Sequence, residues 1–171
     1  MASLRQNILV STFFTLFGGP ALVLVYFPYT ITHFRVAPDQ PTWRFIVAGL
    51  LIAAGLAPLF ESIVRFIVVG RGTLVPTTPT QQLVVSGLYR YVRNPMYLGV
   101  LTVITGEALL FSGRAMVQYL ATVFAGFHLF VCFYEEPRLT RTYPVEYVRY
   151  RSHVHRWLPR LAPWNGNDKP I

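Results

Sequence analysis

The sequence predicts an all-α integral membrane protein, a helical bundle of about four transmembrane helices followed by a C-terminal cytoplasmic amphipathic helix. Its composition is 53% hydrophobic and only 13% charged, whereas soluble domains are usually about 25% charged. A chain of 171 residues is too short to bury that much apolar surface in a core of its own. We therefore expect one membrane domain spanning residues 1–171.

Four long apolar segments support this class. They cover residues 8–34, 45–69, 95–112 and 115–134. Each is about as long as the roughly 20 residues that cross a bilayer core. The first contains Pro20 and Pro28 as expected kinks, and it is longer than the apolar stretch of a signal peptide.

The junctions between these segments carry local signals. Gly113 and Arg114 alone separate the last two segments, which predicts a tight antiparallel hairpin. Glu61 and Arg65 are four residues apart, with the acid first, and should pair on one helix face. Residues 70–85 contain two prolines and four threonines and are expected to form a loop.

The distribution of positive charge predicts the orientation. With the N-terminus in the cytoplasm, twelve of the fifteen Lys and Arg residues lie on the cytoplasmic side. Only Arg35, Arg44 and Arg114 lie on the other side. The positive-inside rule thus favours a multi-pass protein with both termini cytoplasmic. In such a chain a net charge of +8 points to membrane lipids or an anionic ligand rather than to nucleic acid.

Two polar regions share the predicted cytoplasmic side. In residues 87–99, Asn94 is a suitable N-cap and Pro95 a suitable first helical residue. Free N–H groups at such a helix start can hold an anion. In the tail, residues 142–158 predict a short helix with an apolar face. That face comprises Tyr143, Tyr147, Tyr150, Val154 and Trp157 or Leu158.

Three isolated residues allow narrower expectations. Glu107 is the one acid deep in an apolar segment, about 12 Å from the cytoplasmic end. It is a base for an amine acceptor, a partner of Arg114, or a structural or tunnel residue. His128 is expected to be a hydrogen-bonded packing residue. Cys132 is the only cysteine, which excludes an internal disulfide, and no metal site is expected.

The order of four motifs resembles a known family. They read GLYRYVRNPMYLG, GEALLF, EEPRL and EYVRYRSHVHRWLP. This combination, within residues 72–163, is similar to the isoprenylcysteine carboxyl methyltransferases, which in turn resemble the phospholipid N-methyltransferases. The resemblance implies methyl transfer from S-adenosylmethionine to a lipid-like acceptor by membrane helices. In agreement, no G-x-G-x-x-G follows a predicted strand.

The resemblance also implies roles for individual residues. Glu135 and Glu136 are expected to close the fourth helix, where acids oppose the helix dipole. The cofactor's ammonium, its ribose hydroxyls or a nearby arginine would offset that cost. Many members have His at the position of Asn94, so no role that needs a ring nitrogen is expected there. The full cofactor-binding set is Asn94, Pro95, Tyr97, Leu98, Gly99, Glu135, Glu136 and Tyr147.

Two arginines are the catalytic candidates. Arg93 and Arg156 match family positions best, and a guanidinium can orient a carboxylate acceptor through two hydrogen bonds. For either one the alternative is a contact with lipid phosphate. The substrate-binding candidates are Tyr91, Glu107 and Tyr150.

Several functions remain open at this point. A lipophilic or prenylated carboxylate acceptor is favoured, because it is already ionised at pH 7 and needs no base. N-methylation of a phospholipid amine is the first alternative. The others are an NADPH-dependent sterol-type reductase and a non-enzymatic membrane scaffold. Two adjacent glutamates would repel the phosphates of NADPH, and a scaffold leaves the polar helix ends without a shared purpose.

Overall fold

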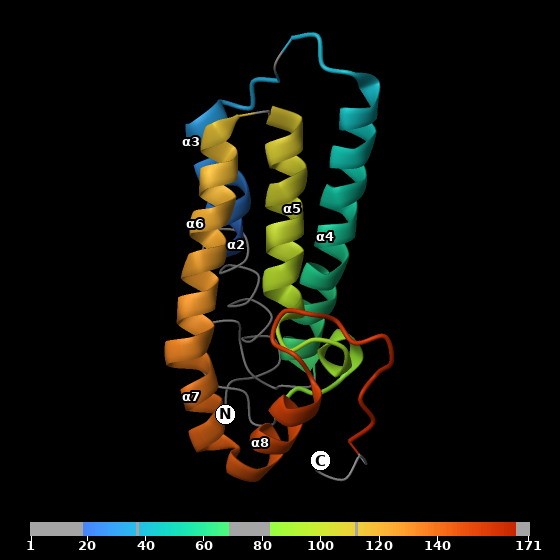
Figure 1. The fold of residues 1–171 in the computed structure, drawn as a ribbon, viewed down its shortest axis with the longest axis vertical. Coiled ribbons are helices and arrows are strands. Elements are labelled where there is room, and N and C mark those ends of the chain that lie inside the picture. The colour runs from blue at the N-terminus through green and yellow to red at the C-terminus, as the bar shows by residue number, and fades with distance from the viewer. Residues whose placement is uncertain (1–18, 37, 69–82, 112, 167–171) are drawn as a thin grey trace.

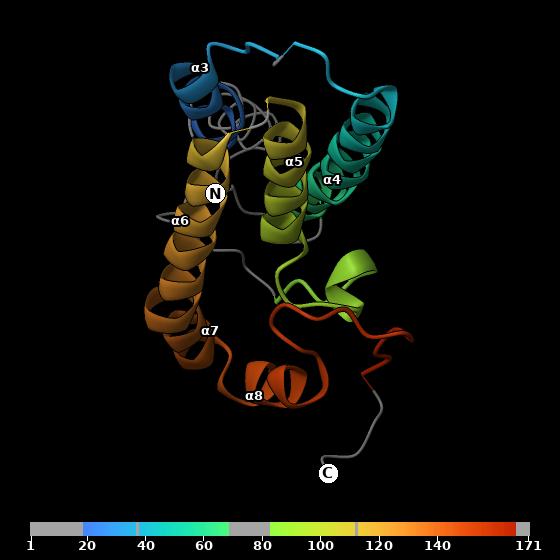
Figure 2. The same ribbon diagram turned by 45° about the horizontal axis from the view of Figure 1, so that its top comes forward.

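A computed structural model describes residues 19–36, 38–68, 83–111 and 113–166. The described residues form helices joined by irregular segments and contain no strand (Figure 1), which confirms the all-α prediction. Three long helices run alongside one another: α4 (Thr42–Val68), α5 (Pro95–Phe111) and α6 (Arg114–Phe130). The tail gathers at the end of the bundle where α5 begins (Figure 2).

Helices α4 and α5 begin and end within three residues of the predicted segments 45–69 and 95–112, and α6 begins one residue before the predicted start at 115. Gly113 lies in the expected short connection between α5 and α6. Two helices are long and apolar enough to cross a membrane, Thr42–Arg65 and Arg114–Thr142. Two other apolar helices in the described ranges are shorter, Gly19–Thr32 and Pro95–Phe111. Length and composition therefore support two of the four predicted spans.

The first segment is one helix made of α2 (Gly19–Ala21), a π-helical turn η1 (Leu22–Tyr26) and α3 (Phe27–Thr32). It ends two residues before the predicted boundary at 34, because His33 and Phe34 adopt positive φ angles of 49° and 53°. Residues 8–18 of the prediction lie outside the described residues, as does most of the predicted loop at 70–85.

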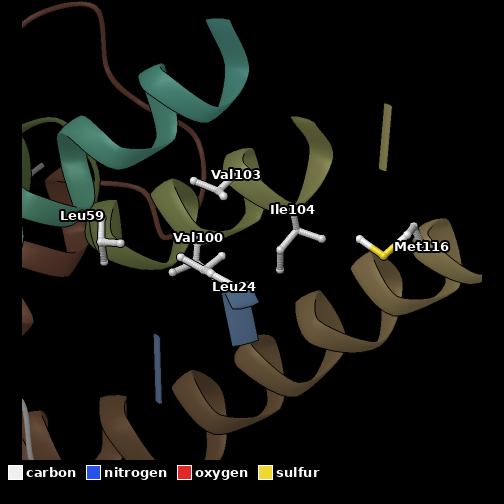
Figure 3. Packing of buried hydrophobic residues seen from close by; sticks show 6 residues of the cluster. All are labelled: Leu24, Leu59, Val100, Val103, Ile104 and Met116. Carbon is white, nitrogen blue, oxygen red and sulfur yellow. The ribbon is translucent and has the colours of Figure 1, made fainter. Parts of the chain in front are cut away.

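Glycines set the contact between α4 and α5. A Cβ added at Gly55 would lie 2.6 Å from the carbonyl oxygen of Gly99, and one at Gly106 would lie 2.8 Å from that of Ala48. Small residues at these positions let the two backbones approach closely. Apolar side chains from four segments pack beside this contact (Figure 3): Leu24, Leu59, Val100, Val103, Ile104 and Met116.

The prediction that Glu135 and Glu136 close the fourth helix was wrong. After α6 the chain continues without a break through a π-helical turn, η3 (Val131–Glu135), and α7 (Glu136–Thr142). Pro137 lacks the N–H that an α-helical bond to residue 133 would need. A wider turn directly before the proline lets the helix pass it, and η1 precedes Pro28 in the same way.

The predicted tail helix over 142–158 is shorter, because α8 covers only Pro144–His153. Its expected apolar face is confirmed for Tyr147, Tyr150 and Val154, which are buried. Trp157 and Leu158 lie beyond the helix, and Leu158 is 71% exposed.

We predict that Gly55→Ala destabilises the protein by about 1–3 kcal/mol, since the added methyl group would overlap the backbone of α5. Gly49→Ala, on the same helix, meets no atom within 4 Å and should be neutral or slightly stabilising. Unfolding midpoints in detergent measure both variants. Equal midpoints would mean that the α4–α5 contact tolerates a wider separation.

Candidate functional site

Hydrogen bonds hold the motif segment, residues 87–99, against the C-terminal tail. The 3-10 helix η2 (Gly87–Arg90) and the residues after it bond to the tail through three backbone pairs (Figure 2). The N–H of Arg93 donates to the carbonyl of His155 at 3.0 Å, that of Arg160 to Tyr91 at 2.9 Å, and that of Trp164 to Arg90 at 2.9 Å. Segments 62 to 74 residues apart in the chain thus share a ladder of hydrogen bonds.

Side chains reinforce this junction. The side-chain amide of Asn94 donates to the backbone carbonyl of Arg156 at 3.1 Å. The hydroxyl of Tyr150 donates to the backbone carbonyl of Tyr89 at 2.5 Å. Helix α5 begins at Pro95 as predicted. The hydrogen bond observed for the Asn94 side chain, however, runs to the tail, so this residue joins the helix start to the segment that carries Arg156.

Glu136 is the charged centre of the site. It accepts two hydrogen bonds from Arg156, at 2.6 and 2.8 Å, and forms an ion pair of 3.1 Å with Arg93. The side chains of Glu136 and Arg93 are only 12% and 11% exposed. The hydrogen bonds to Glu136 raise the pKa of Arg156 above its ordinary value. Both catalytic candidates therefore meet one of the predicted cofactor acids.

Glu135 faces a small polar cavity. It accepts a hydrogen bond of 3.1 Å from the hydroxyl of Tyr97. The cavity measures about 70 Å³, and its lining includes Arg93, Asn94, Tyr147 and Tyr150. The Nε atom of Arg93 is buried and has no hydrogen-bond partner among the described residues. A buried donor of this kind is costly unless a ligand or water satisfies it.

The tyrosines of this cavity remain neutral hydroxyl groups. Burial, with the nearby Glu136 adding to it, raises the pKa of Tyr147 to about 12. Its hydroxyl accepts a hydrogen bond of 3.3 Å from Arg93. Burial likewise raises the pKa values of Tyr89 and Tyr150 above the ordinary range. These side chains therefore offer apolar rings and uncharged hydroxyls at neutral pH.

Tyr97 lines an apolar cavity of about 460 Å³ between the first helical segment, α5 and α6. The centroid of its ring lies 4.6 Å from that of Phe127, and its hydroxyl donates a hydrogen bond to Glu135. Other lining residues are Val23, Leu59, Val100 and Gly126. Tyr97 thus lines the apolar cavity and bonds to an acid that lines the polar cavity.

Other predicted site residues lie elsewhere. Pro95, Leu98, Gly99 and Tyr91 line an open groove of about 860 Å³ between α4 and α5, rather than the polar cavity. Glu107 is 8% exposed and lines none of the three cavities described here. The predicted cofactor set is therefore divided among three places, because Tyr97 lines the apolar cavity. No metal-binding cluster occurs among the described residues.

Some contributors to the site were not predicted. Tyr89, Val131 and Leu139 line the polar cavity, and Arg160 and Trp164 hold the tail against the motif segment. Tyr89 belongs to the motif of residues 87–99, so its place in that motif could have indicated it. Nothing in the spacing of the others distinguishes them from ordinary apolar or interfacial residues.

The comparisons with known proteins identify the family of the chain. No curated protein and no solved structure matches the chain significantly. The family model described as phospholipid methyltransferase matches residues 43–146, more than half of the chain, from α4 to the start of α8. Family membership implies a membrane methyltransferase, and the family generally uses S-adenosylmethionine. The chain belongs to the phospholipid methyltransferase family.

Proposed function

We propose that this protein transfers a methyl group from S-adenosylmethionine to a lipophilic acceptor at the membrane. The observation that carries the proposal is the hydrogen bond from Tyr97, which lines the apolar cavity, to Glu135, which lines the polar cavity. Methyl transfer depends on aligning the acceptor with the donor. A water-soluble donor and a lipid acceptor can meet where two such cavities adjoin.

The polar cavity offers groups that suit the cofactor. The carboxylate of Glu135 would take its ammonium or ribose hydroxyls, and the unpartnered Nε of Arg93 would take its carboxylate. Tyr147 and Tyr150 would add rings and hydroxyls. When bound, S-adenosylmethionine supplies an activated methyl group. Ligand sites are usually at least about 300 Å³, so binding requires the lining side chains or the tail to shift.

The acceptor we favour is a prenylcysteine-type carboxylate with its apolar chain in the cavity beside Phe127. An ionised carboxylate needs no base. Arg156 is already engaged by Glu136 through Nε and Nη2, so its role is to hold that acid and the tail in place.

A phospholipid amine is the second candidate, and the family match favours it. An amine must lose a proton before it accepts a methyl group. Glu135, at the junction of the cavities, would be the base in that case. Glu107 lines neither cavity, so we assign it no part in the reaction.

The proposal includes the topology expected from the sequence: one domain, four spans and both termini in the cytoplasm. Helix α5 has 17 residues and is about 26 Å long, slightly less than a bilayer core of about 30 Å. Its start at Pro95 would lie at the cytoplasmic interface, where the polar cavity can receive the cofactor.

Cysteine labelling tests this topology. In a Cys132→Ser background, we expect Gly113→Cys and Gly166→Cys to react with a membrane-impermeant maleimide from opposite sides of sealed vesicles. Labelling of both from the same side would overturn the four-span arrangement.

Calorimetry tests the cofactor. We expect purified protein in detergent to bind S-adenosylhomocysteine but not NADPH. Glu135→Gln should weaken binding by about 10- to 100-fold, the usual loss for a hydrogen bond to a charged group. Glu146→Gln, on an exposed position of α8, serves as the control. Unchanged affinity in Glu135→Gln would remove this acid from the cofactor site, and binding of NADPH alone would point to a reductase.

Filling the apolar cavity tests the acceptor site. Gly126 lines this cavity and has no atom within 4 Å of an added Cβ. Gly126→Leu should lower turnover of a lipid acceptor at least about tenfold, because the acceptor loses space. Affinity for S-adenosylhomocysteine should stay unchanged. Gly49→Leu, equally unhindered on α4, should leave turnover intact. Wild-type turnover in Gly126→Leu would place the acceptor elsewhere.

A further inference from the structure

Arg156 reaches Glu136 from a segment with no regular structure. Helix α8 ends at His153, and the residues that follow belong to no helix or strand. A long side chain on such a segment has many alternative positions, and holding one of them costs conformational entropy. The bidentate geometry at Glu136 therefore requires that neighbouring contacts keep the segment in place.

The next residue, Trp157, supplies such a contact. Its indole Nε1–H donates to Nδ1 of His128 at 3.1 Å. Its ring lies 6.2 Å from the ring of His128 and 5.6 Å from that of Phe124. Both partners belong to α6. Consecutive tail residues thus contact the same long helix, Arg156 at Glu136 and Trp157 at His128.

The π-helical turn brings these two contact points into line. His128 and Glu136 are eight residues apart, which would separate them by about 80° around a regular α-helix. Turn η3 lies between them and holds more residues per turn than an α-helix. The wider turn offsets this angular separation, so one short tail segment can reach both side chains.

We propose that His128 and Trp157 are positioning residues that hold Arg156 on Glu136, and so shape the site whose methyltransferase function is proposed above. The hydrogen bond requires Nδ1 of His128 to be an acceptor, so the ring is neutral and carries its proton on Nε2. That nitrogen faces the Sγ atom of Cys132 at 3.6 Å. The proposed role of His128 therefore depends on its Nδ1 atom.

Two amide variants separate the nitrogens of His128. In His128→Asn the amide lies near the position of Nδ1 and can still accept from Trp157. In His128→Gln the amide lies near the position of Nε2, so the bond to Trp157 is lost. Both replacements are neutral and polar. Trp157→Phe removes the donor and keeps most of the ring.

Affinity for S-adenosylhomocysteine and tryptic cleavage of the tail are measured for each variant. We expect His128→Gln and Trp157→Phe to weaken binding about three- to tenfold and to speed cleavage after Arg156 and Arg160 by a similar factor. His128→Asn should stay near wild type. The double variant with Gln and Phe should be no worse than either single variant, because both remove the same bond.

Each outcome bears on the proposal. Equal losses in His128→Asn and His128→Gln, with the same unfolding midpoint, would overturn it, because a general packing role does not distinguish the two nitrogens. Wild-type behaviour in Trp157→Phe would also overturn it. If the wild-type protein did not bind S-adenosylhomocysteine, the proposed function would fail, while tail cleavage in the three variants would still decide the positioning role.

Discussion

The partly buried ion cluster of Glu136, Arg93 and Arg156 is the interaction on which the rest of the site depends. It joins the start of α5, the long helix through α6 and α7, and the C-terminal tail. A buried carboxylate is tolerated when it is paired and hydrogen-bonded, and removing one partner leaves an uncompensated charge. The backbone ladder between Arg93 and the tail keeps those charges together.

The direction of the two acids on the long helix depends on one π-helical turn. Pro137 excludes a regular α-helical bond, and the π-helical turn before it carries the helix past the proline. As a result Glu135 points toward Tyr97 and Glu136 toward the arginines. The same turn aligns His128 with Glu136, so the tail meets the helix at two points.

Two different environments meet at Tyr97. Its ring packs on Phe127 in an apolar cavity, and its hydroxyl bonds to Glu135 beside a polar one. On the α4 side of α5, glycines bring the two helices close, and residues at the start of α5 line an open groove shared with α4. Helix α5 therefore contacts α4 on one side and contributes to the apolar cavity on another.

The sequence by itself determined the all-α class, the apolar segments, the start of α5 at Pro95 and the pairing of Glu61 with Arg65, because hydrophobicity, capping and i,i+4 spacing act locally. It also singled out the motif segment, the two acids and both arginines. Only the tertiary structure decided that the acids lie within a helix, that Arg156 is held by Glu136, and that Leu98 and Gly99 face a different groove from Tyr97. Those outcomes depend on a π-helical turn and on hydrogen bonds between segments distant in the chain, neither of which local spacing encodes.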